Sequence, residues 1–277
     1  MLPAFKLLAL AATLVLFIAV APGQGSMSVA SRVLSPELVE LRAGAFRFRA
    51  SGEFSRDGKP ATAPNVTVRI ERTLAMMKHQ VTAADYRRCI KAQACPMLET
   101  DAVASDRPVV GVSWQDAQAY ASWLSRETGT HFRLPTDEEW AYAAADRFVD
   151  DAMPESVDSS DPGQRMLAIY DREASREKVT EKAPQPIGSF GANDNGLLDM
   201  AGNVWEWTST CFQRSAIGAA GEAATVAYCG IRVVEGRHRT YISDFVRDAR
   251  AGGCSVGTPP SNLGFRLVRD ATPPLHD

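Results

Sequence analysis

The stretch IGSFGANDNGLLDMAGNVWEW, residues 187–207, is the most informative part of this chain. Two carboxylates, Asp199 and Glu206, flank a Gly202-Asn203 turn, and two tryptophans follow closely. The glycines interrupt any regular helix or strand, so we expect an irregular loop. Acidic oxygens on a tight loop suit a hard cation such as calcium. The alternative is a buried turn, in which glycine and asparagine adopt the left-handed conformation and the tryptophans enter the core.

The composition is that of a globular protein. The chain has 277 residues, of which 45% are hydrophobic and 23% are charged, which allows one large domain or two small ones. A formal net charge of −3 gives no sign of binding to nucleic acid or to an anionic membrane. The densest basic patch, from Arg232 to Arg250, is interleaved with acidic residues and is typical of a solvated face. We therefore expect no nucleic-acid partner.

The N-terminus predicts export. Lys6 precedes an unbroken apolar run from Leu7 to Ala21, which as a helix would cover about 22 Å, less than the roughly 30 Å hydrocarbon core of a bilayer. Residues 1–21 are therefore predicted to be a signal peptide. Pro22 is a poor cleavage context, so an uncleaved anchor is the alternative, and it would be the chain's contact with a membrane. We expect a periplasmic or secreted protein, with residues 22–35 as a linker.

Export gives the five cysteines a structural meaning, because disulfides form in oxidising compartments. Cys89 and Cys95 are six residues apart, and Cys211 and Cys229 bracket an insert of mostly small residues. We predict the disulfides Cys89–Cys95 and Cys211–Cys229, each closing a local loop. Cys254 is then left over, and the alternative that it replaces a member of either pair stays open.

Secondary structure is predicted to be short and mixed. Alternating apolar residues predict strands over 38–49, with a turn at Gly44, and over 66–70, with a loop over 51–65 between them. Short β segments are expected near 231–234 and 265–268. Three helices are predicted to begin at the capping-box pairs Thr82 with Asp85, Ser113 with Asp116, and Thr136 with Glu139. These elements predict an irregular α+β domain.

Motifs for several common chemistries are missing from the sequence. It contains no P-loop, dinucleotide fingerprint or nucleophile elbow. Its four histidines are dispersed, with no zinc-ligand spacing between any two. Composition and motif spacing alone therefore predict an exported α+β domain and no specific function.

Five segments together resemble the formylglycine-generating enzyme family, also called sulfatase-modifying-factor domains. They are KHQVTAADY (78–86), RPVVGVSWQDAQAYASWL (107–124), FRLPTDEEWAYAA (132–144), IGSFGANDNGLLDMAGNVWEW (187–207) and SNLGFRLVRD (261–270). The resemblance covers residues 36–270 and leaves 271–277 as a tail. It implies the family's fold, an irregular, C-type-lectin-related α+β domain with little regular secondary structure.

The resemblance also implies a structural calcium ion in the loop over residues 187–207. Carried over by position, its ligands are the side chains of Asp199 and Glu206 and the backbone carbonyls of Gly202 and Val204. Oxygen ligands around a tight glycine turn are what a hard cation prefers.

The resemblance does not extend to the family's catalytic metal. Its catalytic members oxidise a cysteine of a sulfatase with copper held by two thiolates, ligands that suit Cu(I). Here no cysteine occurs from Gly230 to Gly253, where that pair is expected. We therefore expect no standard formylglycine synthesis.

Two classes of function remain. The first is an enzyme of oxidative maturation or modification that uses copper or iron. The divergent segment 235–254 would line its site, with His238 and Asp244 as acid/base groups and Cys254 as a thiolate or soft ligand. The second is a non-catalytic accessory protein, whose groove binds an exported protein or a peptide-like partner, such as a periplasmic redox enzyme of the copper nitrite reductase type.

The placement of three side chains discriminates between these classes. Convergence of His238, Asp244 and Cys254 in one pocket would favour the enzyme. Divergence would favour the accessory protein, with His238 and Asp244 pairing with nearby arginines at the surface and Cys254 buried or disulfide-bonded.

Overall fold

The computed structural model describes residues 35–98, 103–150, 183–218, 221–248 and 262–270, with a few positions between 161 and 171. These residues belong to one compact unit, Leu34–Asp277. The predicted signal peptide and the tail 271–277 lie outside the described residues. Within the described part of the chain, none of the helices combines the length and the apolar character needed to cross a bilayer.

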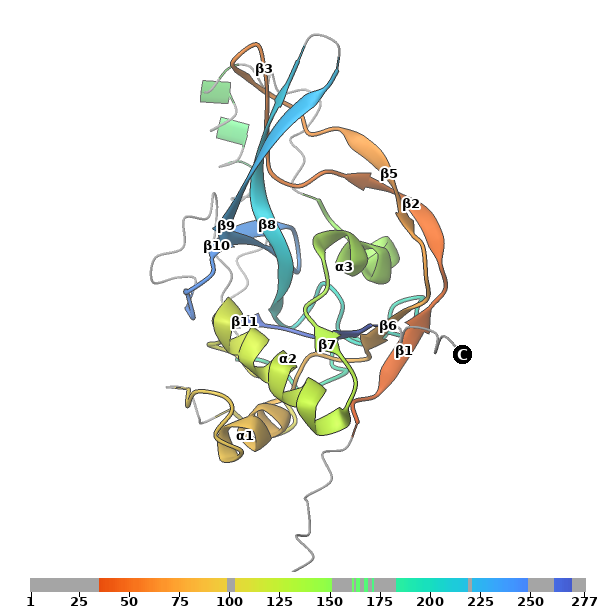
Figure 1. Cartoon of the computed structure of the whole chain (residues 1–277), viewed down its shortest axis with the longest axis vertical. Helices are drawn as coiled ribbons and strands as arrows, with labels where there is room; N and C mark the ends of the chain where they lie inside the picture. Colours follow the sequence, from red (N-terminus) through yellow and green to blue (C-terminus); the bar gives the residue numbers. More distant parts are fainter. Residues whose placement is uncertain are drawn as a thin grey trace, which may run out of the picture. The chain divides into compact units, whose positions relative to one another are not determined.

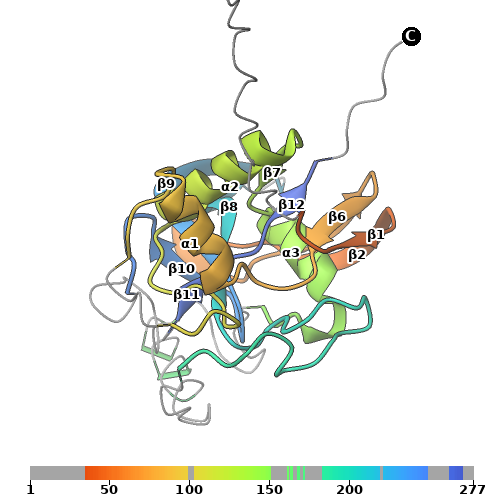
Figure 2. The ribbon, with the colours of Figure 1, turned by 90° about the horizontal axis from the view of Figure 1, so that it is seen from below.

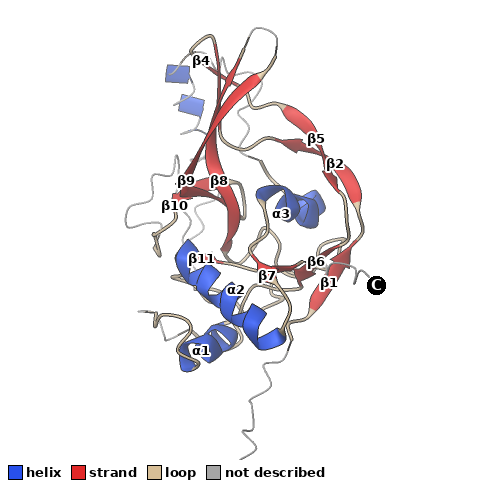
Figure 3. Ribbon diagram, viewed as in Figure 1, coloured by secondary structure: helices blue, strands red, loops and turns tan. Residues whose placement is uncertain are grey.

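Strands make up most of the regular structure, as Figure 3 shows. They form a four-stranded sheet, a six-stranded sheet and a two-stranded ribbon. The four-stranded sheet has the order β1 (Leu38–Leu41), β6 (Leu74–Met77), β12 (Val268–Arg269), β7 (Phe132–Arg133). The six-stranded sheet has the order β10 (Thr240–Ser243), β9 (Ala223–Glu235), β8 (Trp205–Ile217), β3 (Glu53–Arg56), β4 (Lys59–Ala61), and β11 (Leu263–Gly264) pairs in parallel with β8. The ribbon consists of β2 (Gly44–Arg49) and β5 (Asn65–Ile70).

Three α-helices of the described residues begin where the sequence predicts. They are α1 (Ala83–Lys91), α2 (Trp114–Thr128) and α3 (Asp137–Ala144), the last followed by a 3-10 turn over Ala145–Arg147. At each start the hydroxyl of the N-cap residue accepts a hydrogen bond from the third backbone amide, and the acidic side chain there accepts one from the N-cap amide. All three predicted capping boxes are thus confirmed. In Figure 1, α3 lies between β8 and the β2–β5 ribbon.

The core beside α3 is built around Trp140, which is fully buried. Its buried neighbours are Leu41, Leu74, Met76, Ala143, Ala144, Leu197, Met200 and Val268. Leu197 and Met200 belong to the 187–207 loop, so that loop contributes side chains to the core. The α+β fold class is confirmed.

Two segments have more β structure than predicted. Residues 51–65 are not a loop but contain the β3–β4 hairpin, whose turn residues Asp57 and Gly58 have φ of 51° and 73°. An Asp-Gly pair at positive φ is a favoured two-residue hairpin turn. The insert between Cys211 and Cys229 is part of the long antiparallel β8–β9 pair. Alanine and glycine have low β propensity, so the composition of this insert did not predict a strand. The strand forms because its backbone pairs with the neighbouring strand.

Both predicted disulfides are confirmed. Cys89 bonds to Cys95 just beyond α1, and Cys211 bonds to Cys229 across β8 and β9. Cys254 lies outside the described residues.

Candidate functional site

The 187–207 loop passes beside α3 and appears in teal in Figure 2. It has no regular structure before β8 begins at Trp205. Its backbone enters the left-handed region at Asp199, Ala201 and Asn203, with φ of 57°, 57° and 64°. Such conformations are uncommon outside glycine and persist where the surroundings hold them. Gly202 is needed for another reason, because a Cβ there would lie 2.9 Å from the Phe190 ring. The surrounding contacts therefore hold the backbone of this part of the loop in an uncommon conformation.

Asp199 ties this loop to itself. Its side chain is fully buried. One carboxylate oxygen accepts a hydrogen bond from the Gly188 amide at 2.6 Å, and the other accepts one from the Phe190 amide at 2.8 Å. The carboxylate thus closes the loop through backbone donors.

Glu206 sits at the centre of a buried polar network and is 1% exposed. The guanidinium of Arg266 is bidentate on its carboxylate, with Nε 2.7 Å from Oε2 and Nη2 2.8 Å from Oε1. The Trp140 indole donates to Oε2 at 2.9 Å, and the Gln80 amide donates to Oε1 at 2.8 Å. A buried carboxylate requires such donors, and here four of them converge on it.

Gln80 occupies the point where the oxygens of the loop meet. Its Nε2 lies 2.8 Å from Glu206 Oε1, 3.2 Å from the Asp199 carbonyl oxygen and 3.4 Å from the Gly202 carbonyl oxygen. The side chain is fully buried, and its Oε1 has no hydrogen-bond partner. An amide nitrogen carries two hydrogens, so three acceptors around it exceed what it can satisfy in full.

This donor set does not fit a calcium ion held by Asp199, Gly202, Val204 and Glu206. Arg266 already neutralises Glu206, the Asp199 carboxylate faces backbone amides, and Gln80 fills the point where the oxygens converge. Across the part of the chain that the structure describes, no cluster of three or more His, Cys, Asp or Glu side chains is placed to hold a metal ion. The calcium assignment stays a prediction from the resemblance.

The structure places two of the three predicted catalytic residues, His238 and Asp244, on either side of β10. His238 is 8% exposed, its Nδ1 is hydrogen-bonded to the Arg239 carbonyl, and its ring packs edge-on against Trp205. Asp244 follows the other end of β10, beside Arg232. The strand between them separates the two residues because it is extended. Cys254 lies outside the described residues, so its place relative to them stays a prediction.

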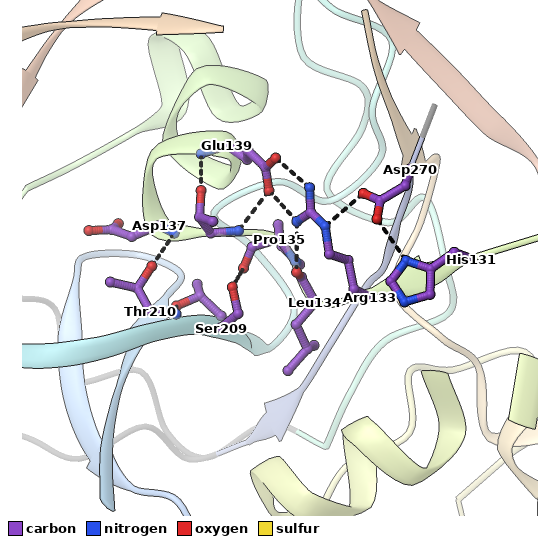
Figure 4. Close-up of polar contacts among 11 residues, drawn as sticks. His131, Arg133, Leu134, Pro135, Asp137, Glu139, Ser209, Thr210 and Asp270 are labelled. Atoms are coloured by element: carbon purple, nitrogen blue, oxygen red, sulfur yellow. Dashed lines mark hydrogen bonds and ion pairs between the residues drawn. The ribbon is translucent and has the colours of Figure 1, made fainter. Parts of the chain in front are cut away.

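A cluster of ion pairs joins β7, α3 and the segment after β12. Arg133 donates to both carboxylate oxygens of Glu139 at 2.7 Å and to Asp270 at 2.8 Å, and His131 contacts the other Asp270 oxygen (Figure 4). In the same view the side chain of Asp137 points away from this cluster. We interpret the Arg133 cluster as structural, because each of its charges is already paired.

A second acidic pair, which was not predicted from the sequence, joins the first residue of α3 to the last residue of β9. Asp137 and Glu235 are 1% and 0% exposed and share one cation, with Arg239 Nε 3.4 Å from Asp137 and 3.0 Å from Glu235. The rings of Phe48 and Phe148 lie against the Arg239 guanidinium, with their centres 4.8 and 5.2 Å from Arg239 Cζ. Burial, the charge of Asp137 and a hydrogen bond to it raise the pKa of Glu235 well above the ordinary 4.5, whereas Arg239 lowers it. A proton on Glu235 would remove the repulsion between the two buried carboxylates.

This pair predicts that Glu235→Gln will gain stability relative to wild type as the pH rises. Folded Glu235 keeps its proton to higher pH than in the unfolded chain, so its contribution to wild-type stability falls above pH 4.5. The glutamine amide resembles the protonated carboxyl and does not titrate. Its relative free energy of unfolding should rise by about 1.4 kcal/mol per pH unit up to the folded pKa. Urea unfolding from pH 4 to 8 measures this difference.

The control is Glu53→Gln, which removes one negative charge from an exposed pair with Arg214. It should show a flat difference over the same pH range. A flat difference for Glu235→Gln as well would mean that the buried pair does not hold a proton.

Comparison with known proteins identifies a matching family and several relatives. Residues 24–271 match the family described as sulfatase-modifying factor enzyme 1-like domain. The chain is 32% identical over 177 residues to a formylglycine-generating enzyme of Streptomyces coelicolor, covering 60% of this chain and 54% of that protein. It is 30% identical over 176 residues to the inactive C-alpha-formylglycine-generating enzyme 2 of Mus musculus, covering 61% and 51%. The chain thus spans about half the length of these curated relatives.

The fold has a solved counterpart. The structure of PvdO from Pseudomonas aeruginosa superposes with a TM-score of 0.55 at 22% identity, covering 85% of this chain and 95% of that one. At this level of identity the likeness concerns the fold alone.

Proposed function

Because the chain belongs to the sulfatase-modifying factor enzyme 1-like domain family, we propose that it is an exported accessory protein that binds a protein or peptide-like partner during the partner's maturation. The observation that carries this proposal is the separation of His238 from Asp244 at opposite ends of β10. A relative at 30% identity is named an inactive formylglycine-generating enzyme, which supports a role for this fold without that chemistry. The partner we propose is a periplasmic redox enzyme of the copper nitrite reductase type.

Two further observations support export and the lack of standard formylglycine synthesis. The disulfides Cys89–Cys95 and Cys211–Cys229 suit an oxidising compartment, the periplasm or the cell exterior. The stretch from Gly230 to Gly253 contains no cysteine, so it offers no thiolate pair for copper.

The second candidate is an oxidoreductase of this family that modifies an exported protein or metabolite with copper or iron. The name of the Streptomyces coelicolor relative, formylglycine-generating enzyme, favours it. In that case His238, Asp244 and Cys254 act at the metal, and substitution of any of them abolishes turnover.

Metal content and oxygen uptake of the exported full chain test the proposal. We expect neither copper nor iron near one equivalent, and no oxygen consumption with a cysteine peptide of a sulfatase. Co-export with a copper nitrite reductase should raise the copper content of the reductase, and His238→Ala and Asp244→Asn should keep that effect. One equivalent of copper or iron with oxygen uptake would overturn the accessory role in favour of the enzyme.

A further inference from the structure

The disulfide between Cys211 and Cys229 crosses β8 and β9 where the ladder is irregular. The register shifts on both sides of Cys211, which lies opposite Arg232 rather than opposite its disulfide partner. Cys229 is exposed, whereas Cys211 is half-buried. The two cysteines of one bond therefore differ in their exposure to solvent.

A cation lies against the sulfur of Cys211, the less exposed of the two cysteines. Arg232 Nη1 is 3.2 Å from Cys211 Sγ and donates to the Ser209 carbonyl at 2.8 Å. The guanidinium lies 3.9 Å from the centre of the Trp114 ring, which fixes its plane. Burial lowers the pKa of Arg232 and the charge of Asp244 raises it, and a guanidinium stays protonated in proteins. Arg232 is therefore a fixed positive charge at Cys211.

This asymmetry sets how the bond would react. A neighbouring cation stabilises a thiolate and lowers the pKa of its thiol. In thiol–disulfide exchange a thiol of lower pKa is the better leaving group, and the sulfur that is attacked must be accessible. Both criteria give the same direction, with attack at Cys229 and departure of Cys211.

We propose that Cys211–Cys229 is a thiol–disulfide exchange site that accepts electrons from a dithiol. A thiolate of the dithiol attacks Cys229 Sγ, forms a mixed disulfide and releases Cys211 as a thiolate beside Arg232. The second thiol of the dithiol loses its proton and attacks the first sulfur of the dithiol, which is bonded to Cys229 in the mixed disulfide. This step releases Cys229, which takes up a proton. The dithiol is oxidised to a disulfide, and the two cysteines receive two electrons. This inference does not depend on the proposed accessory function.

The same molecule contains a reference disulfide. Cys89 and Cys95 are 0% and 8% exposed, so neither sulfur is open to an incoming thiolate. The strand β8 also offers a matched control for the cation. Arg214 is exposed and lies against the rings of Phe212 and Tyr228, and it pairs with Glu53.

Equilibration of the full chain with reduced and oxidised dithiothreitol tests the proposal, with free thiols alkylated and located by peptide mass. Cys211–Cys229 should be reduced with an equilibrium constant at least about tenfold larger than that of Cys89–Cys95, which corresponds to about 30 mV. Arg232→Met should lower the constant for Cys211–Cys229 about tenfold, and Arg214→Met should leave it unchanged. Equal reduction of the two disulfides, or no response to Arg232→Met, would overturn the proposal.

A second measurement reads the leaving group directly. In Cys229→Ser the remaining Cys211 thiol should titrate below the ordinary value of about 8.5, and adding Arg232→Met should raise its pKa. If Cys229→Ser does not fold, brief exposure of wild type to glutathione replaces it, and acid-quenched peptides should carry glutathione on Cys229. Glutathione on Cys211, or an ordinary pKa for Cys211 that does not respond to Arg232→Met, would contradict the assigned direction.

Discussion

Replacing Arg266 by methionine should lower the free energy of unfolding by about 3–5 kcal/mol, because it leaves the Glu206 carboxylate buried without its counter-ion. Both side chains are almost fully buried, and their Nε to Oε2 distance is 2.7 Å. The same guanidinium also donates to the carbonyls of Met77, Lys78 and Leu198. Methionine keeps the length and apolar character of the stem, so the loss reports the charge and its hydrogen bonds rather than a cavity.

Urea unfolding with matched controls isolates this effect. Arg269→Met removes an arginine three positions along the chain, whose partner Glu40 is 3.4 Å away in an exposed pair. That control should cost no more than about 1 kcal/mol. The double variant Arg266→Met with Glu206→Gln should recover part of the loss, because no unpaired charge remains. Equal costs for Arg266→Met and Arg269→Met would mean that the Glu206 network is not a buried ion pair.

Replacing Gln80 by glutamate should convert the loop into a calcium-dependent element. The new carboxylate would face Glu206 and the carbonyls of Asp199 and Gly202, which Gln80 Nε2 now contacts. Two facing buried carboxylates are destabilising without a cation, and we expect a loss of about 2–4 kcal/mol in chelator. Calcium should restore about 2.7 kcal/mol at a hundredfold excess over its dissociation constant.

Thermal unfolding in EDTA and in calcium measures this change. Wild type should melt at the same temperature in both, because the amide of Gln80 holds the place of a cation. Gln80→Met is the control, since it loses the polar contacts and offers calcium no ligand, so it should be destabilised and not rescued. A wild-type melting temperature that rises with calcium would contradict this expectation and support the assignment made from the resemblance.

Local chemistry explains which parts of the fold the sequence could predict. The capping boxes at Thr82, Ser113 and Thr136 are decided within four residues, and all three form as predicted. The two disulfides also close short loops. The β3–β4 hairpin was missed although its Asp57-Gly58 pair is a known turn signal, because the surrounding Gly, Pro and Ser residues suggested a loop.

The candidate site was harder to predict because its partners are distant in the chain. Gln80 and Glu206 are separated by 126 residues, and Arg266 lies 60 residues beyond Glu206. The two carboxylates suggested a cation, and only the three-dimensional contacts identify the guanidinium and the amide that face them. The Asp137–Glu235 pair was missed for the same reason, since Asp137 sits in a helix start that is explained by its capping residues alone.

The place of β12 in the four-stranded sheet has a consequence for biosynthesis. This strand lies between β6 and β7, and it comes after every other described strand in the chain. Chains emerge from the ribosome from the N-terminus onward, and domains fold as their parts become available. The sheet therefore cannot close, and Arg266 cannot reach Glu206, until the segment 262–270 is available to the rest of the domain. A chain truncated before this segment should remain sensitive to protease, and the full chain should become resistant in a single late step.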